Sequence, residues 1–192
     1  PSLSRPILLL KMFQCGVGLG LCRLMLAIFD VTSSVVCLGG LVSSPFKEVL
    51  GVREGAVESP HAFNMYVRDL RKHLEDAHPR LCCLMGVIIA VVLYADDAAL
   101  PADNIEDLQL LASLFEQYCN TNRLFIATSK SFVTVFHPPN DTNVVYENSK
   151  VRVDGHEVII KIYDEVIAAA ECFKYFRCAN EFHMLPPRTW RV

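Results

Sequence analysis

Residues 81–95 form an uncharged apolar run that ends directly before Asp96 and Asp97. This run is shorter than the roughly 20 residues that a membrane-spanning helix requires. It therefore predicts buried secondary structure in place of a membrane span. Residues 87–94 are rich in β-branched side chains, which predicts a strand buried on both faces. Because the extended pattern resumes at residues 98–100, the two aspartates are expected at the tip of a hairpin.

Helices are predicted where apolar residues recur at helical spacing behind a capping residue or an early proline. The predicted helices are residues 4–13 with Ser4 as the cap, residues 19–29, a helix from the cap Ser59 to His78-Pro79, and a helix capped by Asn104 and Asp107 with Leu108, Leu111, Phe115 and Tyr118 on its inner face.

Further extended segments are predicted between these helices and after them. Residues 35–37 and a piece near 46–49 flank a Gly39-Gly40 turn as a hairpin. Residues 151–153 and 158–163 flank Asp154-Gly155, a pair typical of tight hairpin turns. Residues 131–136 and 173–176 are each expected to form a strand. Helices and antiparallel hairpins in this order indicate an α+β fold, and the 192 residues suit one domain.

The composition excludes several classes of protein. Hydrophobic residues make up 52% and charged residues 20% of the chain, which argues against intrinsic disorder. The net charge of −3 lacks the basic excess of a free-standing nucleic-acid-binding protein. Either the chain does not hold nucleic acid, or the basic parts lie outside it. The eight cysteines include no CxxC pair, so we expect buried or idle thiols in place of a disulfide framework or a metal site.

Asp96 and Asp97 are the main candidates for chemistry. Two ionised carboxylates on an apolar hairpin repel each other and lose hydration, which is unfavourable unless a cation joins them. Carboxylate oxygens suit Mg²⁺, and two metal ions about 4 Å apart can stabilise the attacking and leaving oxygens of a phosphoryl transfer. The alternative is a solvated turn, because aspartate is common in turns.

Four motifs, in this order, resemble those of reverse transcriptases, and most closely those of non-LTR retrotransposons. They are GVREGAVESP at 51–60 followed by FNMY at 63–66, the YxDD-like Tyr94-Ala95-Asp96-Asp97, Leu124-Phe125-Ile126 followed by Ser129-Lys130, and Phe173-Lys174-Tyr175.

The resemblance implies a palm-like antiparallel sheet packed on helices, and a role for each matched position. Asp96 would be the metal-binding carboxylate and Asp97 its partner, while Tyr94 and Ala95 would border the primer terminus and the incoming nucleotide. Nucleotide and template would approach the loop that contains Gly51, Arg53 and Gly55, and Lys130 would lie near the triphosphate. Without the resemblance, Lys130 would be read as a surface lysine, Arg53 as a solvated loop residue and Tyr94 as a packed strand aromatic.

The resemblance is incomplete. The family has a further metal-binding aspartate on an earlier strand, which we expect upstream of Pro1; Asp30 follows a helical pattern and is a poor substitute. Glu54 stands where the family usually has glutamine. Fingers and thumb are missing, so residues 1–176 are expected to be a partial palm domain and residues 177–192 an unassigned tail. We therefore expect this chain alone to bind Mg²⁺ weakly or not at all and to be inactive.

In the complete enzyme, the implied partners are an RNA template, a DNA primer and deoxynucleoside triphosphates, with no membrane involved. The resemblance implies an intracellular protein and is compatible with the nucleus. Two alternatives remain open: a non-catalytic relic of such an enzyme, and a small α+β interaction module in which Asp96-Asp97 is only a turn.

Overall fold

The computed structural model describes residues 3–48, 50–52, 56–78, 80–137 and 143–171. The chain divides into two compact units, residues 1–125 and residues 126–192, and each is described by itself. The mixture of helices and small, mostly antiparallel sheets is an α+β fold, as the sequence predicts. No helix in the described ranges has both the length and the apolar composition needed to cross a membrane.

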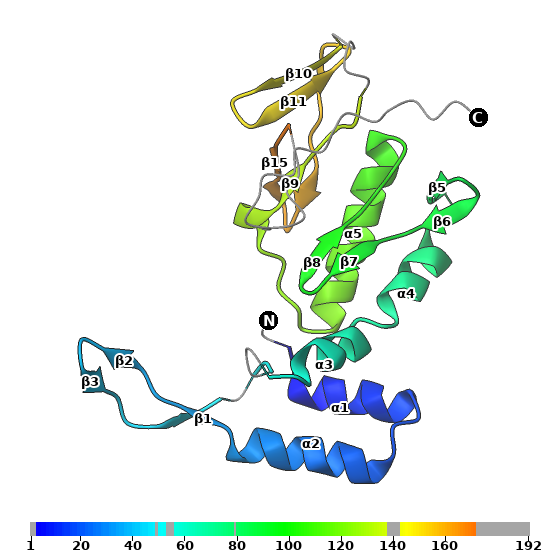
Figure 1. Ribbon diagram of the computed structural model, residues 1–192. Helices are drawn as coiled ribbons and strands as arrows, with labels where there is room; N and C mark the ends of the chain where they lie inside the picture. Colours follow the sequence, from blue (N-terminus) through cyan, green and yellow to red (C-terminus); the bar gives the residue numbers. More distant parts are fainter. Residues whose placement is uncertain (1–2, 49, 53–55, 79, 138–142, 172–192) are drawn as a thin grey trace. The chain divides into compact units, whose positions relative to one another are not determined.

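The described residues of the first unit include five helices, labelled α1 to α5 in Figure 1. Helix α1 packs against α2 and α3, and α4 packs against α5. The largest fully buried side chains of this unit come from α1, the segment before it, α3, α4 and α5: Leu3, Leu8, Tyr66, Leu70, Leu74 and Leu111. The helices are α1 (Arg5–Gln14), α2 (Leu19–Val31), α3 (Ser59–Tyr66), α4 (Leu70–Ala77) and α5 (Ile105–Thr121).

Helix α1 begins where the sequence predicts, but not for the expected reason. Ser4 occupies the N-cap position, yet its side chain makes no capping hydrogen bond, so that part of the prediction is wrong. The Ser4 backbone N–H instead donates to the hydroxyl of Tyr66, 3.3 Å away. Pro6 in the first turn fixes a helical φ and loses no hydrogen bond there, because the first N–H groups of a helix have no partner within it.

The single helix predicted from Ser59 to His78 is two helices. Helix α3 ends at Tyr66 and α4 begins at Leu70. In a continuous helix the Tyr66 carbonyl would accept from the Leu70 N–H, but that N–H donates to Val67 O. The Tyr66 carbonyl accepts instead from Lys11 Nζ at 2.6 Å. The start is also displaced by one residue, because Glu58 holds the N-cap position and Ser59 is already helical.

Helix α5 confirms its predicted cap. Asn104 Oδ1 accepts from the Asp107 N–H at 2.8 Å, which satisfies one of the free donors at the helix start. On the predicted inner face Leu111 and Tyr118 are buried, whereas Leu108 and Phe115 are half-buried.

The described strands of the first unit form four short antiparallel ladders. The pairs are β1 (Ser33–Ser34) with β4 (Phe46–Lys47), β2 (Cys37–Leu38) with β3 (Leu41–Val42), β5 (Cys82–Leu84) with β6 (Val87–Ile89), and β7 (Val92–Tyr94) with β8 (Asp97–Ala99). Three of them are hairpins, and the fourth, β1 with β4, lies at the base of the β2–β3 hairpin. The turn predicted at Gly39-Gly40 is confirmed, with both glycines at positive φ, but residues 37–38 pair with 41–42 and not with the segment expected near 46–49.

The prediction of one strand over residues 87–94, buried on both faces, is wrong. A turn at Met85-Gly86 folds the first part of the apolar run back on itself, so that Leu84 faces Val87 in the β5–β6 hairpin. The second part pairs separately as β7 and β8. Among the described residues each hairpin is a sheet of two strands by itself, and Val87 is 62% exposed.

The described residues of the second unit, 126–137 and 143–171, form short strands and one 3-10 turn. Asp154 and Gly155 both have positive φ and connect Val153 to the facing His156, which confirms the predicted hairpin turn. The predicted strand at 131–136 is shorter than expected, and the predicted strand at 173–176 lies outside the described residues. The elements are η1 (Thr128–Lys130), β9 (Phe132–Val133), β10 (Val144–Glu147), β11 (Lys150–Val153), β12 (His156–Glu157), β13 (Lys161–Ile162), β14 (Glu165–Val166) and β15 (Ala168–Ala169).

Candidate functional site

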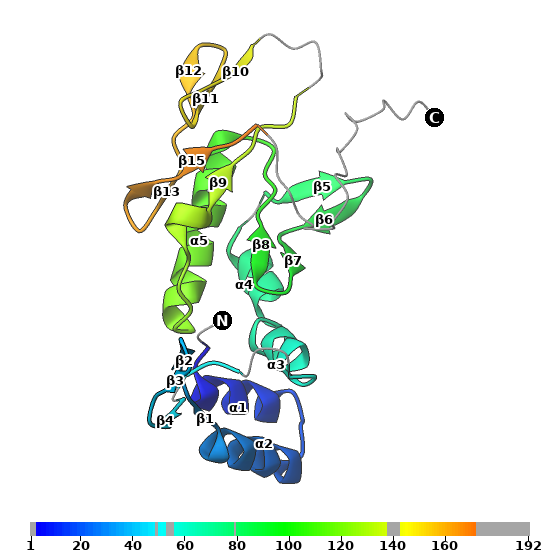
Figure 2. The ribbon, with the colours of Figure 1, turned by 60° about the vertical axis from the view of Figure 1, so that its left-hand side comes forward.

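Strands β7 and β8 form a hairpin (Figure 2), and the two aspartates lie at its tip, as the sequence predicts. Tyr94 and Asp97 face each other as the last pair of the ladder, which leaves Ala95 and Asp96 as the two turn residues. Ala95 has φ +51°, a conformation that glycine adopts more readily than alanine. Two-residue hairpin turns commonly require a positive φ at the first central position. The chain therefore keeps a mildly strained residue directly before Asp96.

Both aspartates are exposed, as are Tyr94 and Ala95. The loss of hydration expected for the two carboxylates is thus not found, because the narrow hairpin leaves its tip open to water. Asp96 lies in the turn and Asp97 begins β8, so the two carboxylates follow each other without an intervening residue.

The carboxylate oxygens of Asp96 and Asp97 are the kind of ligand that a hard cation such as Mg²⁺ prefers, but two residues are too few for a complete site. Among the residues that the structure describes, no group of three or more histidine, cysteine, aspartate or glutamate side chains is arranged to hold a metal ion. Asp96 and Asp97 alone do not make a complete site for two metal ions.

Gly51, the first residue of the predicted substrate-binding loop, is buried and held on both sides. Its N–H donates to Leu3 O at 2.8 Å, and its carbonyl accepts from Arg5 Nε at 3.0 Å. Its φ of +80° favours glycine at this position. Arg53 and Gly55, the other predicted residues of this loop, lie outside the described residues.

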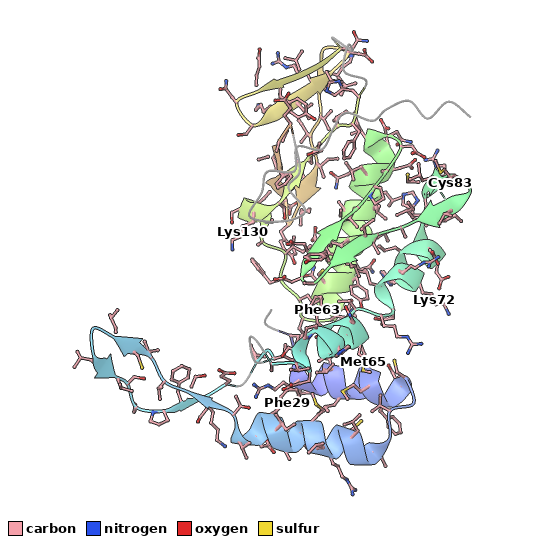
Figure 3. The ribbon with its side chains drawn as sticks, viewed as in Figure 1. Phe29, Phe63, Met65, Lys72, Cys83 and Lys130 are labelled. Atoms are coloured by element: carbon pink, nitrogen blue, oxygen red, sulfur yellow. The ribbon has the colours of Figure 1, made fainter. Side chains whose placement is uncertain are left out.

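Lys130 lies at the end of the 3-10 turn η1 in the second unit, and its side chain is exposed (Figure 3). Residues 124–127, which precede the turn, form no strand. Asp96 belongs to the first unit. Among the described candidate residues, Gly51 and the residues of the β7–β8 hairpin therefore lie in the first unit, and Lys130 lies in the second.

Sequence reasoning missed two buried cations on α1, Arg5 and Lys11. Each is 8% exposed. Arg5 contacts Gly51, whereas Lys11 Nζ lies 2.6 Å from Asp69 Oδ1 and donates to Tyr118 Oη at 2.9 Å. A signal was present in the sequence, because charged residues embedded in an apolar helix are rarely buried without partners. Which partners they would find could not be read from the pattern.

The family model for reverse transcriptase (RNA-dependent DNA polymerase) matches residues 7–176. The chain belongs to the reverse transcriptase family. The match spans the β7–β8 hairpin, Gly51 and Lys130. Enzymes of this family generally use Mg²⁺ and act with a nucleic-acid template, a primer and nucleotides. No curated protein matches the chain in a sequence search.

Proposed function

We propose that this chain is the palm portion of an RNA-directed DNA polymerase from a non-LTR retrotransposon. The observation that carries the proposal is the β7–β8 hairpin, in which the YxDD-like residues place Asp96 in the turn and Asp97 at the start of the second strand. The ordered motifs at residues 51–66 and 124–130 support it, together with the family match. On this proposal residues 1–176 form a partial palm domain and residues 177–192 are an unassigned tail.

The proposed roles follow the motif positions. Asp96 is the principal metal-binding carboxylate and Asp97 its partner. Tyr94 and Ala95 border the primer terminus and the incoming nucleotide. Substrate-contacting positions away from the hairpin are Gly51, Arg53 and Gly55 in the loop and Lys130 on η1.

Metal-assisted nucleotide transfer needs more than this hairpin supplies. Mg²⁺ in the complete enzyme would stabilise the attacking and leaving oxygens of the phosphoryl transfer. The protein must fix such ions with correctly placed ligands, and small misplacements lower activity strongly. Asp96 and Asp97 are the only two ligands proposed in this chain, so the 192-residue chain by itself is proposed to be inactive and to bind Mg²⁺ weakly.

A primer-extension assay tests the activity of the chain alone. The purified chain is incubated with an RNA template, a DNA primer, deoxynucleoside triphosphates and either Mg²⁺ or Mn²⁺. We expect no extension above that of the Asp96→Asn variant. Robust extension that Asp96→Asn abolishes would overturn the proposed inactivity while supporting the role of Asp96.

A graft tests the polymerase role itself. Residues 92–99 replace the corresponding hairpin of an active reverse transcriptase, with Asp96→Asn and Asp97→Asn versions of the graft as controls. We expect the unsubstituted graft to extend primers and the Asp96→Asn graft to lose that activity. A folded graft in which Asp96→Asn has no effect would favour the alternative, an α+β interaction module whose acidic tip is a simple turn.

A further inference from the structure

The Arg5 side chain donates hydrogen bonds to backbone carbonyls in three parts of the first unit. Its Nε donates to Gly51 O at 3.0 Å, and its Nη1 donates to Phe29 O at 3.2 Å and also to Glu48 O. The guanidinium carbon lies 4.7 Å from the centre of the Phe29 ring, which is labelled on α2 in Figure 3. A single buried side chain therefore joins the start of α1, the end of α2, the end of β4 and the loop at Gly51.

The same segment holds the other side of Gly51. The Gly51 N–H donates to Leu3 O at 2.8 Å, two residues before Arg5. Residues 3 and 5 thus bind both backbone polar groups of Gly51. Because Gly51 has φ +80°, the chain turns sharply at this point, and the two hydrogen bonds set the direction in which it continues.

Glu48, three residues before Gly51, also contacts Arg5. Its carboxylate Oε2 lies 3.7 Å from Arg5 Nη2, and its Oε1 accepts from the Ser34 hydroxyl. The carbonyl of Glu48 accepts from Arg5 as well. Arg5 therefore holds the chain three residues before Gly51 and at Gly51 itself.

We propose that Arg5 is a positioning residue, which fixes Gly51 and so sets where Gly51 meets nucleotide and template. This inference rests on the proposed function for its consequence, but its structural part stands on the hydrogen bonds of Arg5. Arginine suits the position better than lysine, since a planar guanidinium presents several donors in fixed directions whereas an ammonium group is a compact point charge.

Lys11 provides a matched control on the same helix. It is equally buried and also cationic, but its hydrogen bonds go to Tyr66, Asp69 and Tyr118. Removing Lys11 should lower the stability of the unit without releasing Gly51 in particular. The two methionine variants, Arg5→Met and Lys11→Met, keep most of the side-chain length and remove the charge.

Amide hydrogen exchange of the ¹⁵N-labelled full chain measures how firmly Gly51 is held. The exchange rate of the Gly51 amide is divided by that of the His78 amide, which bonds to Leu74 O in α4. We expect Arg5→Met to raise this ratio by about tenfold and Lys11→Met to leave it within about twofold, because loss of a local contact opens that region selectively. Equal ratios in the two variants, or an unchanged ratio in Arg5→Met, would overturn the proposal.

Arg5→Lys keeps the result decisive if Arg5→Met does not fold. Lysine retains the positive charge but cannot serve the Gly51, Phe29 and Glu48 carbonyls in the same geometry. The Gly51 ratio should still rise by about threefold or more, which corresponds to partial loss of local protection. Full protection of Gly51 in Arg5→Lys would contradict the need for a guanidinium.

A binding assay tests whether the position of Gly51 matters for nucleotide and template. Anisotropy measures the binding of a fluorescent DNA primer annealed to an RNA template, with a deoxynucleoside triphosphate present. Arg5→Met should weaken binding by about tenfold, and Lys11→Met by less than about threefold, where tenfold corresponds to about 1.4 kcal/mol. Equal weakening in both variants would overturn the functional part of the inference. Failure of the unsubstituted chain to bind would overturn the functional part of the inference without touching the proposed function, and the exchange ratios would still decide whether Arg5 holds Gly51.

Discussion

Lys11 Nζ lies 2.6 Å from Asp69 Oδ1, and this contact joins α1 to the short segment between α3 and α4. The Tyr118 hydroxyl on α5 donates to the same carboxylate oxygen at 2.5 Å. Lys11 Nζ also lies 5.2 Å from the centre of the Tyr66 ring and 4.9 Å from that of Tyr118. Three parts of the first unit therefore meet at one polar cluster, which consists of Lys11, Asp69, Tyr66 and Tyr118.

This cluster predicts how stability depends on acid pH. Burial alone would raise the pKa of the Asp69 carboxyl, but hydrogen bonds from Lys11 and Tyr118 outweigh it and hold that pKa below its ordinary value of 3.8. Because the fold favours the ionised form, the contribution is present above pH 3.8 and is lost as the pH falls through the lower pKa of the folded state. The carboxylate is 59% exposed, so we expect an effect of about 1 kcal/mol or less.

Urea unfolding of the chain between about pH 5 and pH 2.5 measures this dependence. Asp69→Asn should lose less stability over that range than the unsubstituted chain, whereas Asp76→Asn, a change at an exposed position of α4, should follow the unsubstituted chain. Identical pH dependence for all three proteins would show that Asp69 does not couple protonation to folding.

Asn104 and Ser4 both occupy N-cap positions, but we expect their substitution to change the free energy of unfolding by different amounts. Asn104 accepts a hydrogen bond from the Asp107 N–H, whereas the Ser4 side chain at the start of α1 makes no such bond. Asn104→Ala should lower the free energy of unfolding by about 1 kcal/mol. Ser4→Ala should lower it by less than about 0.5 kcal/mol, because no cap is removed. Denaturant titration of both variants gives the comparison, and equal losses would refute the assignment of the caps.

The cysteines predict a selective pattern of chemical reactivity. Burial, with a smaller contribution from Glu116, raises the pKa of the Cys119 thiol to about 12. Cys15, Cys37 and Cys83 are exposed, and Figure 3 shows Cys83 on the β5–β6 hairpin. At pH 8, iodoacetamide should modify these three cysteines at least about a hundredfold faster than Cys119, because the thiolate is the reacting form and access is required.

Peptide mapping by mass spectrometry follows each of these cysteines separately. In denaturant the difference between Cys119 and Cys83 should disappear, which serves as the internal control. Comparable rates for the two cysteines in the native chain would mean that α5 is not packed against its neighbours as described.

Local signals predicted the parts of the fold that depend on local chemistry. The turn at Asp154-Gly155 follows from residues that tolerate positive φ, and the start of α5 follows from the Asn104 cap. The position of Asp96 in a hairpin turn was predicted on the same basis. In each case the responsible residues lie within a few positions of one another.

Features that depend on distant partners were not predictable from local patterns. The break between α3 and α4 depends on the Tyr66 carbonyl, which bonds to Lys11 from a position 55 residues away in the chain. The hold on Gly51 depends on Arg5, 46 residues away. Hydrophobic periodicity reports which face of a helix is buried, but it does not report which buried cation meets which carbonyl.

The division of the apolar run at residues 81–95 shows another limit of sequence patterns. Periodicity alone does not distinguish one long buried strand from two short hairpins with the same composition. The turn at Met85-Gly86, with φ +50° and +80°, decides between them. Glycine at position 86 was the local signal that could have indicated the turn.

Whether the acidic tip of the β7–β8 hairpin binds a divalent cation can be measured by Mn²⁺-induced paramagnetic broadening of the ¹⁵N-labelled chain. At millimolar Mn²⁺ we expect the amide signals of residues 95–98 to broaden first. Asp96→Asn together with Asp97→Asn should remove this broadening, and Asp103→Asn should leave it in place. Broadening that spreads evenly over the exposed acids of the chain, or that persists at residues 95–98 in the double variant, would contradict the claim that this tip is built to bind a divalent cation.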